Sequence, residues 1–153
     1  MNSIPKLSLK DLLKNDISSI SILSKALSNH GFFIITDHEI PHALFDKAYE
    51  LSHKFFNLDL STKNSYSFRE NAGARGYTPF GKETALGESV ADLKEFWHHG
   101  PVIDETYDFR IMKNIYVNEI DEFNDVFDEL FNQMNDLGSK LLSSISLTLG
   151  LDI

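Results

Sequence analysis

The run Gly31-Phe32-Phe33-Ile34-Ile35-Thr36-Asp37-His38 constrains the fold of this chain more than any other stretch. It is continuously apolar, rich in aromatic and β-branched residues, and bounded by Gly and Asp, a pattern typical of a short buried strand. Amphipathic helical patterns flank it on both sides, so the local unit is helix–strand–helix. We therefore expect both faces of the strand, over about residues 31–36, to be covered.

Apolar residues at helical spacing predict three main helices, over about residues 16–29, 41–57 and 118–149. Gly31 suits the left-handed position after the first, and Pro41 suits the first turn of the second. Asn118 can cap the third. The three stripes are Ile20, Leu23 and Leu27; Leu44, Ala48, Leu51 and Phe55; and Phe123, Phe127, Leu130, Met134, Leu137, Leu141 and Ile145.

Two further stretches have the character of strands, residues 4–8 and residues 92–99. Alternation along the second would place Lys94, Phe96 and His98 on one face, and Glu95, Trp97 and His99 on the other. Periodicity fades between residues 58 and 91, which predicts a long loop of the kind that is usually functional or mobile. The expected fold class is therefore α+β.

Composition predicts one globular domain over residues 1–153. The hydrophobic fraction is 42%, the formal net charge is −9, and there is no cysteine. The negative charge argues against a nucleic acid or an anionic membrane as partner, and disulfide or thiolate chemistry is excluded. Without a signal-peptide pattern or a membrane-spanning apolar run, we expect a cytoplasmic protein.

Two histidine patterns suggest metal binding, but in neither can the two histidines reach one metal ion. Residues 38–42 spell His-Glu-Ile-Pro-His, but the zinc-protease motif needs both histidines on one helix face, and Pro41 would break that helix. His98 and His99 are neighbours in a strand, so they point to opposite faces and cannot chelate one ion. No metal ligand is predicted. The acidic stretch from Glu119 to Asp136 is most simply a solvated helix face, with partner docking as the alternative.

A loop and a strand supply the candidate binding residues. Arg75 with Tyr77 could bind a carboxylate through a guanidinium fork and a phenol, although most loop arginines are simply solvated. Phe96 and Trp97 are more simply core residues than residues that stack on a cofactor.

An ordered set of short motifs resembles the N-terminal domain of the isopenicillin N synthase-like oxygenases, which use iron(II) and mostly 2-oxoglutarate. Tyr116-Val117 departs from the Trp-Pro that this family often has. The matching motifs run in the family's order along nearly the whole chain: Ile4-Pro5, Gly31-Phe32-Phe33, His38-Glu39-Ile40-Pro41, His53-Lys54-Phe55-Phe56, Gly76-Tyr77-x-Pro79-Phe80-Gly81, Asp92-Leu93-Lys94-Glu95-Phe96-Trp97-x-x-Gly100, Asn114-x-Tyr116 and Leu149-Gly150-Leu151.

The resemblance implies a catalytic centre that these 153 residues do not encode. The family holds iron with His-x-Asp and a distant His, and 2-oxoglutarate with Arg-x-Ser, all in a C-terminal double-stranded β-helix. None of the six histidines is followed two residues later by Asp or Glu. None of the three arginines is followed two residues later by Ser. We expect no catalytic residue and no cofactor in this chain; iron(II) and 2-oxoglutarate would come only with a C-terminal domain.

The resemblance also implies that this chain contributes residues to the substrate-binding side of the family's active-site pocket. Relatives contribute substrate contacts from an Arg/Tyr loop and from the Lys-Glu-Phe strand. This makes Arg75, Tyr77, Phe96 and His98 the substrate-binding candidates. The alternative is that Phe96 packs in the core and the other three are solvated.

Three interpretations follow, of which the last, a decayed remnant, has no function. The first is the N-terminal, substrate-side and scaffolding portion of an iron(II)/2-oxoglutarate oxygenase, split or truncated and not catalytic alone. The alternative is a free-standing binding or assembly module derived from that family. In relatives the short strands complete the sheet of the catalytic domain, so here a sheet edge would be unpaired. We therefore expect homo-oligomerisation or docking with a separately encoded C-terminal half.

Overall fold

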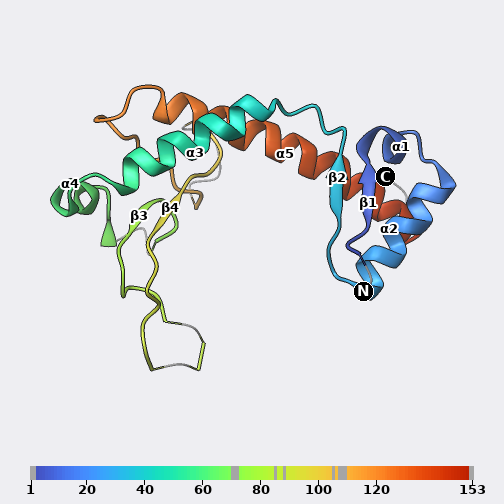
Figure 1. The fold of residues 1–153 in the computed structure, drawn as a ribbon, viewed down its shortest axis with the longest axis horizontal. Helices are drawn as coiled ribbons and strands as arrows, with labels where there is room; N and C mark the ends of the chain where they lie inside the picture. Colours follow the sequence, from blue (N-terminus) through green and yellow to red (C-terminus); the bar gives the residue numbers. More distant parts are fainter. Residues whose placement is uncertain are drawn as a thin grey trace. The chain divides into compact units, whose positions relative to one another are not determined.

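The computed structural model describes residues 3–69, 73–84, 86–87, 89–104, 106 and 110–151 (Figure 1). The fold is α+β, as predicted from the sequence. Within the described ranges no helix is long and apolar enough to cross a membrane. The elements in chain order are β1 (Lys6–Ser8), α1 (Leu9–Leu13), α2 (Ile17–Asn29), β2 (Ile34–Thr36), α3 (His42–Phe56), α4 (Leu60–Ser65), β3 (Gly76–Thr78), β4 (Phe96–His98) and α5 (Phe123–Thr148).

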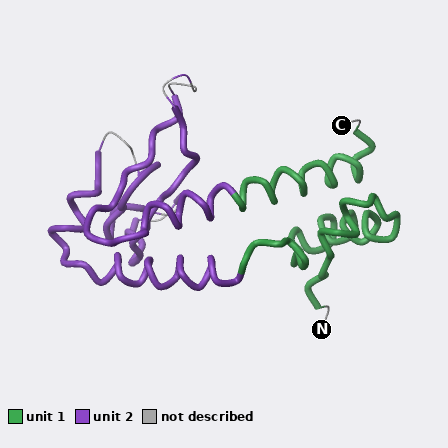
Figure 2. Tube along the Cα trace, turned by 90° about the horizontal axis from the view of Figure 1, so that it is seen from above, with its two compact units in different colours: residues 1–41, 133–153 green, residues 42–132 purple. Residues whose placement is uncertain are grey.

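The chain divides into two compact units, coloured separately in Figure 2. Unit 1 comprises residues 1–41 and 133–153, and unit 2 comprises residues 42–132. Helix α5 contributes its first part to unit 2 and the remainder to unit 1. Each unit contains its own cluster of buried apolar side chains. The single domain predicted from the sequence stays a prediction.

Unit 1 is built around a parallel pair of short strands. β1 pairs with β2 in the register Lys6↔Ile34, Leu7↔Ile35 and Ser8↔Thr36. Helix α2 is capped by Asp16, whose carboxylate accepts from the Ser19 amide, and it ends before Gly31 at a φ of 77°, as its sequence predicts. The core joins these elements to the end of α5, with members Leu7, Leu12, Leu23, Ile20, Leu27, Phe33, Ile35, Leu141 and Ile145.

The expectation that both faces of strand 31–36 are covered is wrong. Phe33 and Ile35 pack in the core, whereas Phe32 and Ile34 are 56% and 40% exposed. Side chains alternate along a strand, so a single covering layer buries every second residue. In the described residues β2 pairs only with β1, which leaves its other edge without a partner strand.

Unit 2 is held together by aromatic packing around Phe55 of α3, which is fully buried. The Phe55 ring centroid lies 4.8 Å from that of Trp97 on β4, 5.9 Å from that of Tyr77 on β3 and 5.6 Å from that of Phe123 on α5. The contacts with Trp97 and Tyr77 are edge-to-face and the contact with Phe123 is tilted. Edge-to-face contacts at such distances are favourable beyond the area that they bury. One side chain thus joins both strands of this unit to two helices.

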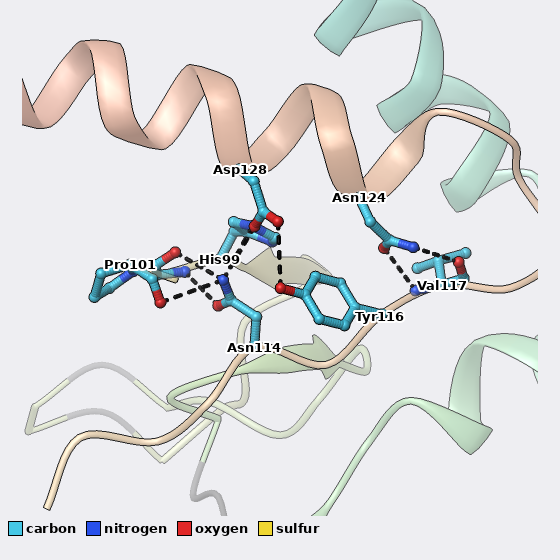
Figure 3. A network of polar contacts seen from close by, with 8 residues as sticks. His99, Pro101, Asn114, Tyr116, Val117, Asn124 and Asp128 are labelled. Atoms are coloured by element: carbon cyan, nitrogen blue, oxygen red, sulfur yellow. Dashed lines mark hydrogen bonds and ion pairs between the residues drawn. The ribbon is translucent and has the colours of Figure 1, made fainter. Parts of the chain in front are cut away.

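Helix α5 begins five residues later than its sequence predicts, at Phe123 rather than Asn118. Glu122 has a φ of 63°, a left-handed conformation that a right-handed helix cannot include. The Asn124 side chain binds both the amide and the carbonyl of Val117 at 2.8 Å, which fixes the approach to the helix (Figure 3). Asn118 therefore does not cap α5.

Three short elements lie in stretches where no helix or strand was predicted. Helix α1 has five residues, too few to show a helical period. Helix α4 lies in the predicted long loop and is capped by Asp59, whose carboxylate accepts from the Thr62 amide at 3.0 Å. Strand β3 has three residues and depends on pairing with β4. Such short segments are fixed by tertiary contacts more than by their own pattern.

Replacing Phe55 by Ala should reduce the free energy of unfolding by about 3–5 kcal/mol, because the change opens a cavity in the aromatic cluster. Tyr49→Ala on the same helix is the matched control, since Tyr49 is 77% exposed, and its effect should stay within about 0.5 kcal/mol. Urea unfolding followed by fluorescence of the single Trp97 measures both. Equal losses for the two variants would contradict the central role of Phe55.

Candidate functional site

The two strands of unit 2 form the framework on which the candidate residues lie. β3 and β4 are antiparallel, with Gly76 opposite His98, Tyr77 opposite Trp97 and Thr78 opposite Phe96. Opposed residues share a face, and successive residues along a strand lie on opposite faces. Tyr77 and Trp97 therefore lie on the face that packs against Phe55, which we call the packed face. Thr78, Phe96 and His98 lie on the opposite face, which we call the open face.

A partly buried ion pair closes one end of the packed face. The Lys63 ammonium lies 2.9 Å from Glu95 Oε2 and donates to the Phe56 carbonyl at 3.0 Å. The Tyr77 hydroxyl donates to the same Glu95 oxygen at 2.5 Å. The cluster thus joins α4, the end of α3 and both strands.

Burial raises the pKa of the Glu95 carboxyl, but hydrogen bonds from Tyr77 and Lys63 outweigh burial and hold that pKa below its usual value. Burial, together with the hydrogen bond to Glu95, raises the pKa of the Tyr77 hydroxyl well above its usual value. Glu95 is therefore a carboxylate and Tyr77 a neutral phenol near neutral pH. In this cluster the Lys63 ammonium and the Tyr77 hydroxyl both donate hydrogen bonds to the Glu95 carboxylate.

A second polar network closes the other end of the packed face (Figure 3). His99 Nε2 lies 2.6 Å from Asp128 Oδ1 on α5, and the Tyr116 hydroxyl donates to the second Asp128 oxygen at 3.2 Å. Asn114 accepts from the Gly100 amide and donates to the Gly100 carbonyl, both at 2.8 Å. These contacts attach the end of β4 and the segment before α5 to one carboxylate.

His99 is neutral in this network. Burial lowers the pKa of its imidazole, the Asp128 carboxylate raises it, and Arg75 lowers it again, with a net shift downward. The acidic stretch predicted as a solvated helix face therefore includes Asp128 as a structural group. Asp128 directly follows Phe127 of the apolar stripe, so it borders the buried side of α5.

Arg75 is packed against backbone. A Cβ atom on Gly100 would collide with the Arg75 guanidinium where it now lies, so the guanidinium is in close contact with this backbone. Arg75 Nη1 donates to the Ala74 carbonyl at 2.6 Å, and Arg75 Nε is buried without a hydrogen-bond partner in the described structure. This arginine is therefore not the freely solvated side chain of the alternative prediction.

The open face has a different character. The Phe96 and His98 rings stack with centroids 5.7 Å apart, and the Lys94 ammonium lies 4.9 Å from the Phe96 ring centroid. On this face Thr78 Oγ1 and His98 Nδ1 are buried without a hydrogen-bond partner in the described structure, as Arg75 Nε, Trp97 Nε1 and His99 Nδ1 are on the packed face. This face therefore combines an aromatic surface with two buried polar atoms that lack a partner.

A cavity of about 680 Å³ borders the open face at Thr78. Its lining comes from the segment after α4, from β3 and from the turn that follows it, and includes the cations Arg69 and Lys82. The lining residues are 67–69, 73, 77–79 and 82–83.

The structure divides the four predicted substrate-binding residues between the two faces. Phe96 and His98 lie together on the open face. Arg75 and Tyr77 belong to the packed face, where Arg75 lies over Gly100 and the Tyr77 hydroxyl is bound to Glu95. The four side chains do not converge on one point. Their contacts with a substrate stay predictions.

Sequence reasoning missed several residues of this region. Lys63 and Glu95 are 32 positions apart, and no local pattern relates them. Arg69 and Lys82 lie in the stretch predicted as an irregular loop, where charged residues are ordinarily solvated. Alternation along residues 92–99 did predict that Glu95, Trp97 and His99 share one face of the strand, which is the packed face.

Comparison with known proteins gives a consistent picture. A family model described as "non-haem dioxygenase in morphine synthesis N-terminal" matches residues 4–120. A proline hydroxylase from Petromyces alliaceus is 32% identical over 136 residues, which cover 84% of this chain and 41% of that protein. A homoarginine-6-hydroxylase from Arabidopsis thaliana is 27% identical over 143 residues, covering 88% and 38%.

The solved structures extend this similarity to the fold. A 2OG-Fe(II) oxygenase family protein from Caulobacter crescentus superposes with a TM-score of 0.84 at 32% identity, over 99% of this chain and 50% of that one. A full-length protein from Neurospora crassa, solved in complex with alpha-KG, shares the fold at a TM-score of 0.78 and 20% identity, over 97% of this chain and 48% of that one. The chain thus spans about two fifths of the length of these curated relatives and about half of these solved chains.

Acidification should destabilise the protein through His99. Its folded pKa is lowered, so its contribution to stability is complete above the usual value of 6.5 and is lost as the pH falls through the folded pKa. Between about pH 7.5 and 5.5 the unfolding free energy should fall more for the wild-type chain than for His99→Gln. His53→Gln, an exposed site on α3, should keep the wild-type slope. Parallel slopes for all three would refute the buried neutral imidazole.

Proposed function

Because this chain belongs to the family of N-terminal domains of non-haem dioxygenases, we propose that it supplies the N-terminal, substrate-side and scaffolding portion of an iron(II)- and 2-oxoglutarate-dependent oxygenase. The similarity over residues 4–120, with a fold match over 99% of the chain, carries this proposal. The relatives' own substrates differ between a proline hydroxylase and a homoarginine hydroxylase, so we assign none of them to this chain.

The residues of this chain do not fit the iron centre that the family implies. The sequence has no His-x-Asp or His-x-Glu pair and no Arg-x-Ser pair. Among the described residues, no three His, Asp or Glu side chains gather in a way that could hold a metal ion. We therefore propose that the iron and 2-oxoglutarate ligands come from polypeptide beyond these 153 residues, either continuous with them or separately encoded.

The chain's own contribution would be to present the open face of the β3–β4 pair. Phe96 and His98 offer a rigid aromatic surface there, and the Lys63–Glu95–Tyr77 cluster keeps the two strands in register behind it. Because these side chains are already fixed, the protein would lose little further side-chain entropy when a substrate binds against them.

A second contribution would come from the free edge of β2 in unit 1. Phe32 and Ile34 expose apolar surface beside backbone groups that pair with no strand in the described residues. Exposed strand edges of this kind associate with other strands. We propose that a C-terminal oxygenase portion adds to this edge; self-association of the chain is the competing outcome.

Reconstitution tests the proposed function. The coding sequence after the Ile153 codon should be read in every frame for His-x-Asp, a distant His and Arg-x-Ser. The polypeptide that contains them, combined with this chain, should consume oxygen only when iron(II) and 2-oxoglutarate are both present. Neither part alone should do so. A tight partner that binds without any iron-dependent turnover would instead indicate a free-standing assembly module.

Replacing Phe32 by Ser should weaken binding of that C-terminal portion by about tenfold or more, because the change removes a large apolar contact from the free edge. Ile17→Ser on α2 is the control, since Ile17 is also exposed in unit 1 but away from the edge. Isothermal titration calorimetry gives both affinities. A clean monomer by light scattering, which binds neither the C-terminal portion nor a hydrophobic dye, would contradict docking at this edge.

A further inference from the structure

The cavity beside the open face contains two cations without an acidic partner. Arg69 and Lys82 both line it and both are exposed, and neither forms an ion pair within the described part of the chain. The whole chain carries a formal charge of −9, so two unpaired cations that line one cavity are opposite in sign to the net charge of the chain. Such an arrangement favours an anionic ligand.

The cations of the described lining suit a carboxylate group. Glu83 is the one acid among the described lining residues, beside the cations Arg69 and Lys82. A guanidinium offers parallel N–H donors that fit the two oxygens of a carboxylate, and an ammonium adds a further donor. A carboxylate satisfies these groups with one negative charge.

Thr78 provides an independent indication of a ligand. It lines the cavity and is only 6% exposed, and its Oγ1 has no hydrogen-bond partner in the described structure. Buried hydroxyl groups are ordinarily bonded, because leaving one unpaired is costly. Because Oγ1 itself is buried, a carboxylate oxygen in the cavity would accept from this hydroxyl once the Thr78 side chain turns toward it.

An adjoining hollow of about 560 Å³ is suited to the rest of such a molecule. It shares Ser67, Pro79 and Lys82 with the first cavity and adds the exposed apolar side chains of Leu60 and Phe80. Lys82 thus lies where a charged group and an apolar body would meet. Ligand pockets commonly combine an apolar lining with a few polar groups that fix orientation.

We infer that these two hollows bind an organic monocarboxylate with an aromatic or aliphatic body. Its carboxylate is held by Arg69, Lys82 and Thr78, and its body lies over Leu60 and Phe80. The binding site stands on the geometry of unit 2 alone. Naming its ligand as the class of substrate that the oxygenase oxidises rests on the proposed function.

Nuclear magnetic resonance titration of the 153-residue chain at neutral pH tests this inference with phenylbutyrate as probe. Its neutral analogue phenylbutyramide lacks the charge, and 2-oxoglutarate is a dianion without an apolar body. Phenylbutyrate should shift amide resonances within residues 67–83 with a Kd on the order of 1 mM, as expected for a small ligand. The other two compounds should bind about tenfold more weakly or not at all.

Variants identify the groups that bind the carboxylate. Arg69→Gln and Lys82→Gln should each weaken phenylbutyrate binding about tenfold, because each removes a charge-assisted hydrogen bond. Lys25→Gln removes the same charge from an exposed site in unit 1 and should leave the affinity unchanged. Both cavity variants change exposed side chains, so loss of folding does not mimic the result.

Equal binding of the acid and the amide, stronger binding of 2-oxoglutarate, or an unchanged affinity in both cavity variants would each overturn the inference. The reconstitution experiment is independent of these outcomes. Turnover restored without phenylbutyrate binding would refute the carboxylate site and leave the oxygenase role intact. Binding without restored turnover would leave the site standing and remove its assignment as a substrate site.

Discussion

Packing around Phe55 is the interaction on which the rest of unit 2 depends. Its ring contacts Tyr77 on β3, Trp97 on β4 and Phe123 on α5, so two three-residue strands are fixed against two helices by one side chain. Strands this short have little stability of their own. The buried aromatic contacts therefore hold the β3–β4 pair, and the pair in turn positions the polar groups on both of its faces.

Because side chains alternate along β3 and β4, one face of the pair packs in the core and the other borders the cavity. Side chains on the packed face end in hydrogen-bonded polar clusters, Lys63–Glu95–Tyr77 at one end and His99–Asp128 with Asn114 at the other. Three buried atoms of this face, Arg75 Nε, Trp97 Nε1 and His99 Nδ1, lack a partner in the described structure. Such clusters are costly unless all their groups are paired, and pairing makes them rigid. The open face borders a cavity, which is where a ligand can gain contacts that the protein has not already made.

The same principle explains why the four predicted site residues do not form one site. A family resemblance identifies segments, and Arg75, Tyr77, Phe96 and His98 do lie on or beside two paired strands. The register Tyr77↔Trp97 then places Tyr77 opposite in orientation to Phe96 and His98. Sequence patterns show the alternation within each strand, but the pairing register between strands is a tertiary property.

From the sequence alone, the α+β class, the three long helices and the family were predicted, because helical periods, the Gly31 terminus and an ordered set of motifs are local features of the chain. The tertiary structure decided the exposed Phe32 and Ile34, the late start of α5 after the left-handed Glu122, and the pairing of Lys63 with Glu95. Each of these depends on which distant segment covers a side chain or accepts its hydrogen bond. A local pattern contains no information on contacts between positions far apart in the chain, so only the folded chain can settle them.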